Sequence, residues 1–214
     1  MQPAAKPTKK EIVTEFRTRE ILAAARGLMQ SRGLEAVTME EIAGAAGVAK
    51  GTVYLYFQGK EDLVQALLSQ VAEKLISGLK PLLDHPGSAG EKLNRLVTFL
   101  LHILEQERVL FPVYARQSSP GGVSQEREGR GRRLRELEEE FVALLSRFFA
   151  EGIEAGQFIP ADPRLLTLMI RELVRAVGYF QMLEKREDAI TEALPVMQAL
   201  LASGLLVRGE VFAK

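Results

Sequence analysis

Cysteine is absent from this 214-residue chain, and histidine occurs only twice, at His85 and His102. The lack of cysteine excludes disulfide scaffolds, thiolate nucleophiles and cysteine-ligated zinc or iron–sulfur sites. Two histidines are too few for a histidine-based metal cage, and no other side chains have the spacing of metal ligands. We therefore expect no metal site and no cofactor.

The signatures of enzymes are missing as well. The chain has no convincing Ser/His/Asp arrangement and no glycine-rich phosphate loop. Glu139 and Glu140 are neighbours on an expected helix, so their carboxylates cannot converge on one substrate bond. We expect that the protein is not an enzyme.

Long hydrophobic runs are lacking too. The longest apolar stretch, at about residues 96–104, is far shorter than the ~20 residues that a membrane span requires. Residues 1–11 are polar and basic and contain no apolar signal core. These two absences predict a cytoplasmic protein.

The overall net charge of zero conceals an asymmetry along the chain. Residues 1–60 carry nine Lys and Arg against six Asp and Glu, a balance of +3, so the remaining 154 residues carry −3. A basic first quarter indicates an anionic partner for the N-terminal end. Ordinary scatter of charge along the chain would explain the same small difference.

Helical periodicity dominates the sequence, and no period-2 strand pattern is present. Capping boxes at Thr8/Glu11 and Thr38/Glu41 begin helices, and Gly33 and Gly47 end them. The pattern predicts an all-α protein of about nine helices, with a flexible loop at 118–122. We expect an N-terminal three-helix domain at 12–75 and a larger helical domain at 76–214.

Residues 38–57 contain the ingredients of a helix-turn-helix, in which two short helices flank a turn at Gly47. In the second helix, at about 50–57, Val53 and Phe57 share one face and should point into a small core. The i, i+4 pairs Lys50/Tyr54 and Thr52/Tyr56 lie on other faces, where Lys and Tyr can donate hydrogen bonds to DNA phosphates. Tyrosines packed in a domain interface would give the same spacing.

An extended run of residues around this motif resembles the tetracycline-repressor (TetR) family of transcriptional regulators. The resemblance spans about residues 14–70 and rests on these segments: Ile21–Ala25, Gly33, Thr38, Glu41–Ala43, Ala46–Val48, Gly51–Phe57 and Lys60–Leu63. It implies that Thr38 contacts a phosphate, that Tyr54 and Tyr56 clamp phosphates, and that Lys60 pairs with one beside the fourth helix. It also implies that Lys50, Gly51 and Thr52 approach the bases and the DNA backbone.

Two positions depart from the family pattern, and one segment is open to two interpretations. Gln58-Gly59 stands where a short capping residue is common, so the fourth helix should begin less firmly. Leu55 is apolar at an often polar or aromatic position, which would fit either a hydrophobic base contact or packing. Lys6, Lys9 and Lys10 could form a basic arm along DNA, although a disordered tail is favoured.

The resemblance places a dimer interface on the last two helices and a ligand pocket at roughly 88–184. The interface candidates are Leu166, Ile170, Leu173, Val177, Met197, Leu200, Leu201, Gly204 and Leu205. The pocket candidates are Phe99, His102, Ile103, Phe111, Tyr114, Phe141, Leu145, Phe148, Met169, Glu172, Arg175 and Tyr179. Most of these apolar residues could equally be ordinary core, and His102 is favoured as a hydrogen-bonded core histidine.

Glu172 and Arg175 need a reason to lie in an apolar helix. They could pair with each other at i, i+3, cross a dimer interface, or meet a polar group of a ligand.

We therefore expect a sequence-specific DNA-binding repressor, acting as a homodimer and released from a palindromic operator by a small apolar or amphipathic effector. One alternative is a dimeric DNA-binding regulator that takes no ligand. Another is a helical protein-interaction module, which steep weakening of DNA binding with salt would exclude.

Overall fold

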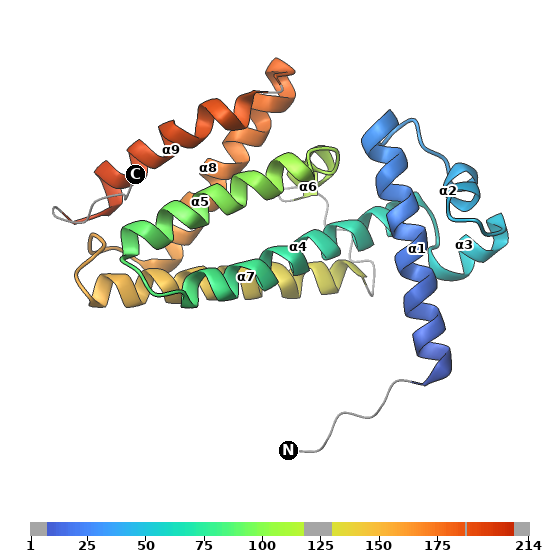
Figure 1. Cartoon of the computed structure of the whole chain (residues 1–214), viewed down its shortest axis with the longest axis horizontal. Helices are drawn as coiled ribbons and strands as arrows, with labels where there is room; N and C mark the ends of the chain where they lie inside the picture. Colours follow the sequence, from blue (N-terminus) through green and yellow to red (C-terminus); the bar gives the residue numbers. More distant parts are fainter. Residues whose placement is uncertain (1–7, 118–129, 187, 208–214) are drawn as a thin grey trace. The chain divides into compact units, whose positions relative to one another are not determined.

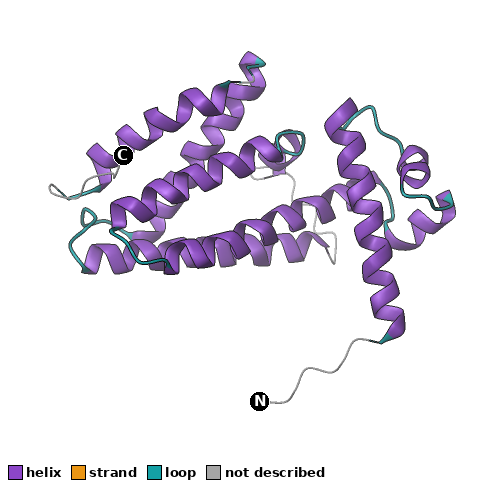
Figure 2. Cartoon of the chain, viewed as in Figure 1, coloured by secondary structure: helices purple, strands orange, loops and turns teal. Residues whose placement is uncertain are grey.

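The structure, a computed structural model, describes residues 8–117, 130–186 and 188–207. Over these ranges it contains nine α-helices and no strand, and an isolated bridge between Phe158 and Leu206 is the β-type pairing found there (Figure 2). The prediction of an all-α protein with a helix-turn-helix unit is therefore confirmed. The predicted loop at 118–122 and Lys6 lie outside the described residues.

The chain divides into two compact units, with the division after Leu67. This point falls within α4 (Lys60–Asp84), and the domain boundary predicted at 75/76 lies further along the same helix. The first unit also contains α1 (Lys9–Arg32), α2 (Met39–Ala45) and α3 (Lys50–Tyr56) (Figure 1). Lys9 and Lys10, considered above as part of an arm, form the first turn of α1.

Local capping sets the helix boundaries of the first unit. Thr8 and Thr38 each form a complete capping box with the glutamate three residues later, Glu11 and Glu41, which satisfies free N–H groups at the helix start. Gly33 has a φ of +82°, a region that L side chains rarely adopt, and its N–H donates to the carbonyl of Met29 to end α1.

A small apolar core holds these short helices together. Its fully buried side chains come from all four helices of the unit and from the loop before α2. They include Ile21, Ala25, Met29, Val37, Ile42, Val53, Phe57, Leu63 and Leu67. Because α2 and α3 have only seven residues each, this burial rather than intrinsic helix stability holds them in place.

The second unit contains the rest of α4 with α5 (Ala89–Gln106), α6 (Phe111–Gln117), α7 (Arg130–Glu154), α8 (Pro163–Glu184) and α9 (Ala189–Leu205). Helix α7 packs on α8, and α5 packs on both α8 and α9. Helices α4 and α7 lie side by side, joined by ion pairs from Lys80 to Glu140 and from Arg133 to Glu73 (Figure 1).

One core fills the second unit, with Leu93, Leu96, Leu145, Phe149 and Phe158 among its buried side chains. The glycine of α8 lets another helix approach closely, because a Cβ at Gly178 would lie 2.5 Å from the ring of Phe111 in α6. In the described ranges, no helix is long and apolar enough to cross a membrane.

Candidate functional site

Helix α3 presents one apolar and one polar face. Val53 and the following Phe57 are buried in the core of the first unit, as the helical spacing predicts. Lys50, Gly51 and Tyr54 are exposed, while Thr52 and Tyr56 are half-buried. The structure thus brings five of the predicted DNA-contacting residues onto one short helix.

Lys50 is held at the surface by a neighbouring helix. Its ammonium forms an ion pair with Glu40 of α2 and lies 6.0 Å from the ring centroid of Tyr54. The carboxylate of Glu40 raises the pKa of Lys50, so this side chain stays charged at neutral pH. A phosphate group that binds Lys50 would therefore compete with Glu40 for it.

Thr38 is exposed at the start of α2, and its hydroxyl is part of the cap. Its Oγ1 accepts from the backbone N–H of Glu41 at 3.3 Å and donates to the Glu41 carboxylate at 2.9 Å. That carboxylate also accepts from the backbone N–H of Thr38 at 2.9 Å and from Arg32 at 2.7 Å. These hydrogen bonds, the Thr38 backbone bond first, lower the pKa of Glu41 to about 2.

The start of α4 has two side-chain hydrogen bonds to the backbone that the sequence did not predict. Asp62, in the first turn of α4, accepts a hydrogen bond from the backbone N–H of Gln58 at 2.9 Å. Lys60 is half-buried, and its Nζ donates to the carbonyl of Glu35 at 3.1 Å. This lysine therefore ties the start of α4 to the loop before α2.

Sequence reasoning left Leu55 open between a hydrophobic base contact and packing. Its side chain is 82% exposed on α3, next to Tyr54 and Tyr56. It therefore contributes nothing to the core, and an apolar residue at this position is available to a partner.

The second unit contains a cavity of about 150 Å³ that is partly open to solvent. Its wall is mostly apolar and comes from five helices: Leu68, Val71, Ala72 and Leu75 of α4, Leu100, Ile103 and Leu104 of α5, Phe111 of α6, Leu134, Leu137 and Phe141 of α7, Val174 of α8, and Leu110 before α6. Polar groups on the wall are Glu107, Tyr114, Glu138, Arg171 and Arg175.

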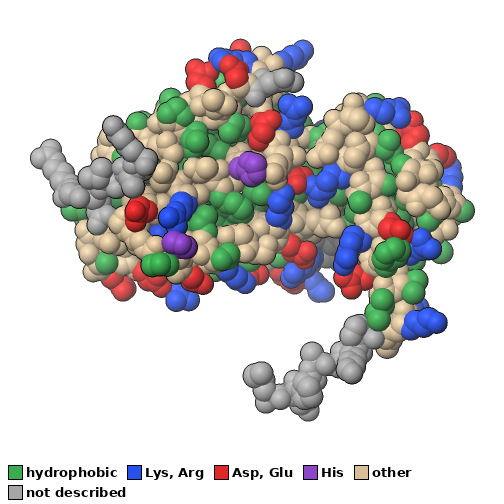
Figure 3. All heavy atoms as spheres, in the orientation of Figure 1, with side chains coloured by type: hydrophobic (Ala, Val, Ile, Leu, Met, Phe, Trp, Pro, Cys, Tyr) green, Lys and Arg blue, Asp and Glu red, His purple; other side chains and the backbone are tan. Residues whose placement is uncertain are grey.

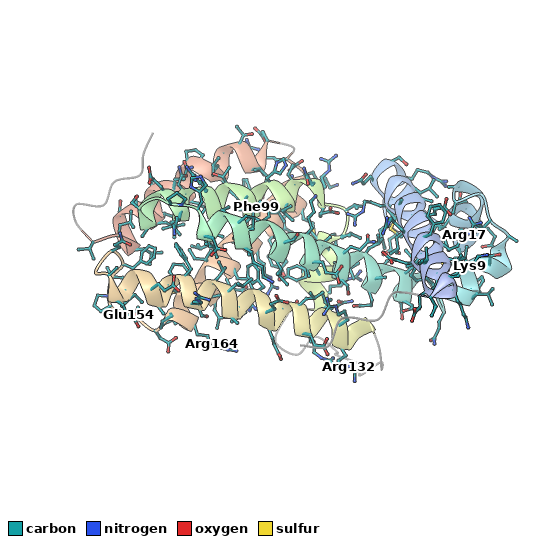
Figure 4. The ribbon with its side chains drawn as sticks, turned by 60° about the horizontal axis from the view of Figure 1, so that its bottom comes forward. Lys9, Arg17, Phe99, Arg132, Glu154 and Arg164 are labelled. Atoms are coloured by element: carbon teal, nitrogen blue, oxygen red, sulfur yellow. The ribbon has the colours of Figure 1, made fainter. Side chains whose placement is uncertain are left out.

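Five of the twelve pocket candidates line this cavity: Ile103, Phe111, Tyr114, Phe141 and Arg175. Leu145 and Phe148 continue the same stripe of α7 but lie in the closed core, because the cavity borders only the earlier turns of that helix. Phe99, labelled on α5 in Figure 4, packs against Gly78 of α4.

The remaining four candidates are not among the residues that line the cavity. His102 is exposed, and its Nε2 lies 2.6 Å from the side-chain nitrogen of Gln106, so it is not the core histidine that the sequence favoured. Met169 and Glu172 are exposed on α8. Tyr179 packs edge-on against Phe111, with 5.4 Å between ring centroids.

Arg175 is the central polar group at one end of the cavity and is only 6% exposed. It donates to Glu172 at 3.2 Å, which confirms the i, i+3 pairing among the roles left open by the sequence. It also donates to the carbonyl of Ala115 at 3.4 Å and to the hydroxyl of Tyr179 at 3.3 Å. Arg175 thereby joins α8 to α6.

Helices α8 and α9 leave an apolar face exposed. Of the interface candidates, Leu166, Ile170, Val177, Met197, Leu201 and Leu205 are buried in the core of their own unit, Leu173 is half-buried, and Leu200 and Gly204 are exposed. The exposed apolar face consists of Leu165, Met169, Phe180, Leu183, Val196 and Leu200. Figure 3 shows hydrophobic side chains at the surface over α9.

Sequence reasoning missed most of this face because both helices are apolar around more than one side. A helix of this kind has two adjacent apolar stripes, and periodicity does not say which stripe faces its own core. The available signal was a second apolar stripe, formed by the residues that directly precede Leu166 and Ile170.

Two family models match the chain. The model for bacterial regulatory proteins of the tetR family matches residues 21–67, and that for the tetracyclin repressor-like C-terminal domain matches residues 86–179. The fatty acid metabolism regulator protein of Bacillus subtilis is 26% identical over 87% of this chain and 94% of its own length. The HTH-type transcriptional repressor KstR2 of Mycobacterium tuberculosis is 29% identical over 72% of this chain and 75% of its own.

Solved structures share the fold. The fatty acid degradation regulator FadR from Bacillus halodurans has a TM-score of 0.67 and 25% identity, covering 86% of this chain and 96% of its own. FadR from Bacillus subtilis in complex with stearoyl-CoA has a TM-score of 0.69 and 23% identity, covering 87% of this chain and 98% of its own.

A helix-turn-helix unit followed by a larger helical unit with a mostly apolar cavity defines a DNA-binding regulator of transcription. With both units matched by models of one family, the chain belongs to the TetR family of transcriptional regulators.

Proposed function

We propose that this regulator is a cytoplasmic homodimeric repressor, not an enzyme, and that an apolar or amphipathic effector releases it from a palindromic operator. Thr38, Lys50, Gly51, Thr52, Tyr54, Tyr56 and Lys60 would contact the DNA. The effector would bind in the cavity of the second unit.

The exposed side of α3 is the observation that carries the DNA-binding part of this proposal. Lys50 and Tyr54 offer hydrogen-bond donors to phosphate oxygens. A Cβ at Gly51 would meet open space, so this position lets a DNA backbone approach the helix closely. Thr52, half-buried between them, can meet a base edge or a thymine methyl group.

The exposed apolar face of α8 and α9 supports the dimer. Leu183 is 71% exposed and Leu200 is 58% exposed, although monomeric proteins rarely leave a contiguous apolar patch in water. Two copies joined by this face would form a four-helix bundle. A dimer is also what an operator with two half-sites, about 34–36 Å apart, requires.

Relatives support the effector class. Two of them are named as regulators of fatty-acid metabolism or degradation, and one was solved with stearoyl-CoA. The mostly apolar cavity fits an apolar or amphipathic molecule. Helix α4 contributes Leu63 and Leu67 to the core of the DNA-binding unit and Leu75 to the cavity wall, so it is our proposed route of coupling.

Fluorescence anisotropy tests this function with duplex DNA from immediately upstream of the protein's own gene and a shuffled duplex as control. We expect tighter binding to the upstream duplex, steep weakening as salt rises, and release by an acyl-CoA or a free fatty acid. Binding that no such molecule changes would favour a regulator without a ligand. No binding even at low salt would favour the protein-interaction module.

A further inference from the structure

One end of the cavity differs chemically from the rest of its wall. Glu138 of α7, Arg171 and Arg175 of α8, and Tyr114 of α6 all line the cavity. The guanidinium of Arg175 lies 5.8 Å from the ring centroid of Tyr114. The rest of the wall is apolar apart from Glu107, whereas this end has two arginines, a carboxylate and a phenol.

In the part of the chain that the structure describes, two carboxylates near this end differ in their partners: Glu172 is hydrogen-bonded to the arginines, and Glu138 is not. Glu172 accepts hydrogen bonds from both Arg171 and Arg175, each at 3.2 Å. Among the described residues, no ion pair or hydrogen bond joins Glu138 to either arginine. Over the described ranges, Glu138 and the two arginines thus share the cavity wall without an ion pair between them.

Resting on the proposed function, we propose that this end of the cavity binds the carboxylate of a small amphipathic acid, with Arg171 and Arg175 as its cationic partners. The hydrocarbon part of the acid would lie among Leu75, Leu100 and Ile103. A carboxylate accepts hydrogen bonds from guanidinium groups, and these bonds are strongest where water is excluded.

The size of the cavity limits the acid. At about 150 Å³ the cavity matches engineered protein cavities that bind one benzene molecule. A chain of about six carbons is therefore the first length to test.

An acid bound here brings a second carboxylate close to Glu138. Two neighbouring carboxylates cannot both remain ionised at low cost, so one of them takes up a proton. The other charged groups around Glu138 are Arg135 on its own helix, Arg171, Arg175 and Glu172 on α8, and the Lys74–Glu107 pair of α4 and α5.

Glu138 is the group best suited to accept that proton. Burial raises the pKa of its carboxyl, while the charges of Arg171, Arg175 and Arg135 act in the opposite direction. Protonation of Glu138 removes one negative charge from the wall that Arg171 and Arg175 share. Binding of an anion should therefore strengthen as the pH falls.

Calorimetric titration of the full chain tests this assignment with hexanoate, 1-hexanol and hexylamine, which share a six-carbon chain and differ in charge. We expect hexanoate to bind about tenfold more tightly than 1-hexanol. Its affinity should rise from about pH 8 to about pH 6, and two buffers with different heats of ionisation should reveal uptake of a fraction of one proton.

Three variants locate the effect. Glu138→Gln should keep hexanoate binding but remove both the proton uptake and most of the pH dependence. Glu139→Gln, at an exposed neighbour outside the cavity wall, should behave as the wild type. Arg171→Met should abolish the preference for hexanoate over 1-hexanol, and it avoids the buried Arg175, whose loss could disturb the contact between α6 and α8.

Equal binding of hexanoate and 1-hexanol, tighter binding of hexylamine, or no binding of any of the three would each overturn the assignment. The anisotropy assay separates that failure from failure of the proposed function. Release of the operator by a neutral or cationic effector would leave the function standing, whereas an operator that no effector releases would remove the ligand-responsive function as well.

Discussion

The candidate functional side chains of the two units differ in orientation. Those of the first unit point outward from its core, and those of the second unit point inward. In the first unit, Lys50 and Tyr54 point away from a small core and into solvent. In the second, Arg175 points inward and is only 6% exposed. A surface cation such as Lys50 can exchange Glu40 for a phosphate at little cost, whereas a buried cation holds its neighbours in one arrangement.

Within the second unit, one apolar stripe of α7 contributes side chains both to the core and to the cavity wall. Phe141 lines the cavity and is half-buried, while Phe149 is fully buried two turns later. Phe149→Ala should lower the free energy of unfolding by about 3–5 kcal/mol, because it leaves a void among closely packed rings.

Phe141→Ala is the matched control, and it should cost much less because its ring already borders empty space. Urea denaturation of both variants checks the difference. Similar losses from the two substitutions would mean that the cavity wall is packed as tightly as the core.

Exposed apolar positions of α9 should matter for association of two chains, whereas its buried positions serve the core of their own unit. Leu200→Glu places a charge on the exposed apolar face and should shift the protein from dimer to monomer, weakening the association by about 2–3 kcal/mol. Light scattering coupled to size exclusion measures the mass in solution. Ser203→Glu, at an exposed polar position on α9, tests how far the interface extends along that helix.

Sequence patterns predicted which side chains of α3 face solvent better than which side chains of α7 border the cavity, for a physical reason. On α3, burial of Val53 and Phe57 follows from helical spacing, and polar neighbours are then left on the surface. On α7, Phe141 and Leu145 belong to the same apolar stripe, yet only Phe141 lines the cavity. Whether an apolar residue fills a core or borders a void depends on helices distant in sequence, which periodicity does not record.

The same reasoning accounts for the polar groups. The Glu172–Arg175 pair could be foreseen because it lies within one helix. The place of Glu138 could not be foreseen, because it shares the cavity wall with the arginines only through the packing of α7 on α8. Likewise, the hydrogen bond that the Gln58 N–H donates to Asp62 depends on the turn between α3 and α4 and not on a sequence motif that marks it.

The third prediction concerns the exposed side of α3. Tyr54→Ala should weaken binding to the operator and to the shuffled duplex alike, by about tenfold, without changing stability. Lys50→Met should reduce the slope of log affinity against log salt by about one. Anisotropy titrations at several salt concentrations check both changes.

Arg147→Met removes an exposed arginine of the second unit and serves as the control for loss of surface charge. A Tyr54→Ala protein that is folded and binds DNA as the wild type does would remove this tyrosine from the site.

The smallest expected effect separates the cap of α2 from the DNA contact that Thr38 is proposed to make. Hydrogen bonds from Thr38 and Arg32 lower the pKa of Glu41 to about 2 in the folded protein. A carboxyl with a lowered folded-state pKa contributes stability above its unfolded pKa, near 4.5, and loses that contribution as the pH falls toward 2. The gap in unfolding free energy between wild type and Glu41→Gln should therefore be widest near neutral pH and close as the pH drops through this window.

Urea denaturation across the acid range measures that gap, with Glu35→Gln as a control at an exposed glutamate of the preceding loop. A gap that stays constant with pH would mean that the charge of Glu41 does not stabilise the cap. Because Thr38→Ala also removes the hydroxyl from the cap, the two variants should lose similar stability near neutral pH. Only Thr38→Ala should in addition weaken DNA binding beyond that loss, if the hydroxyl meets a phosphate as we propose.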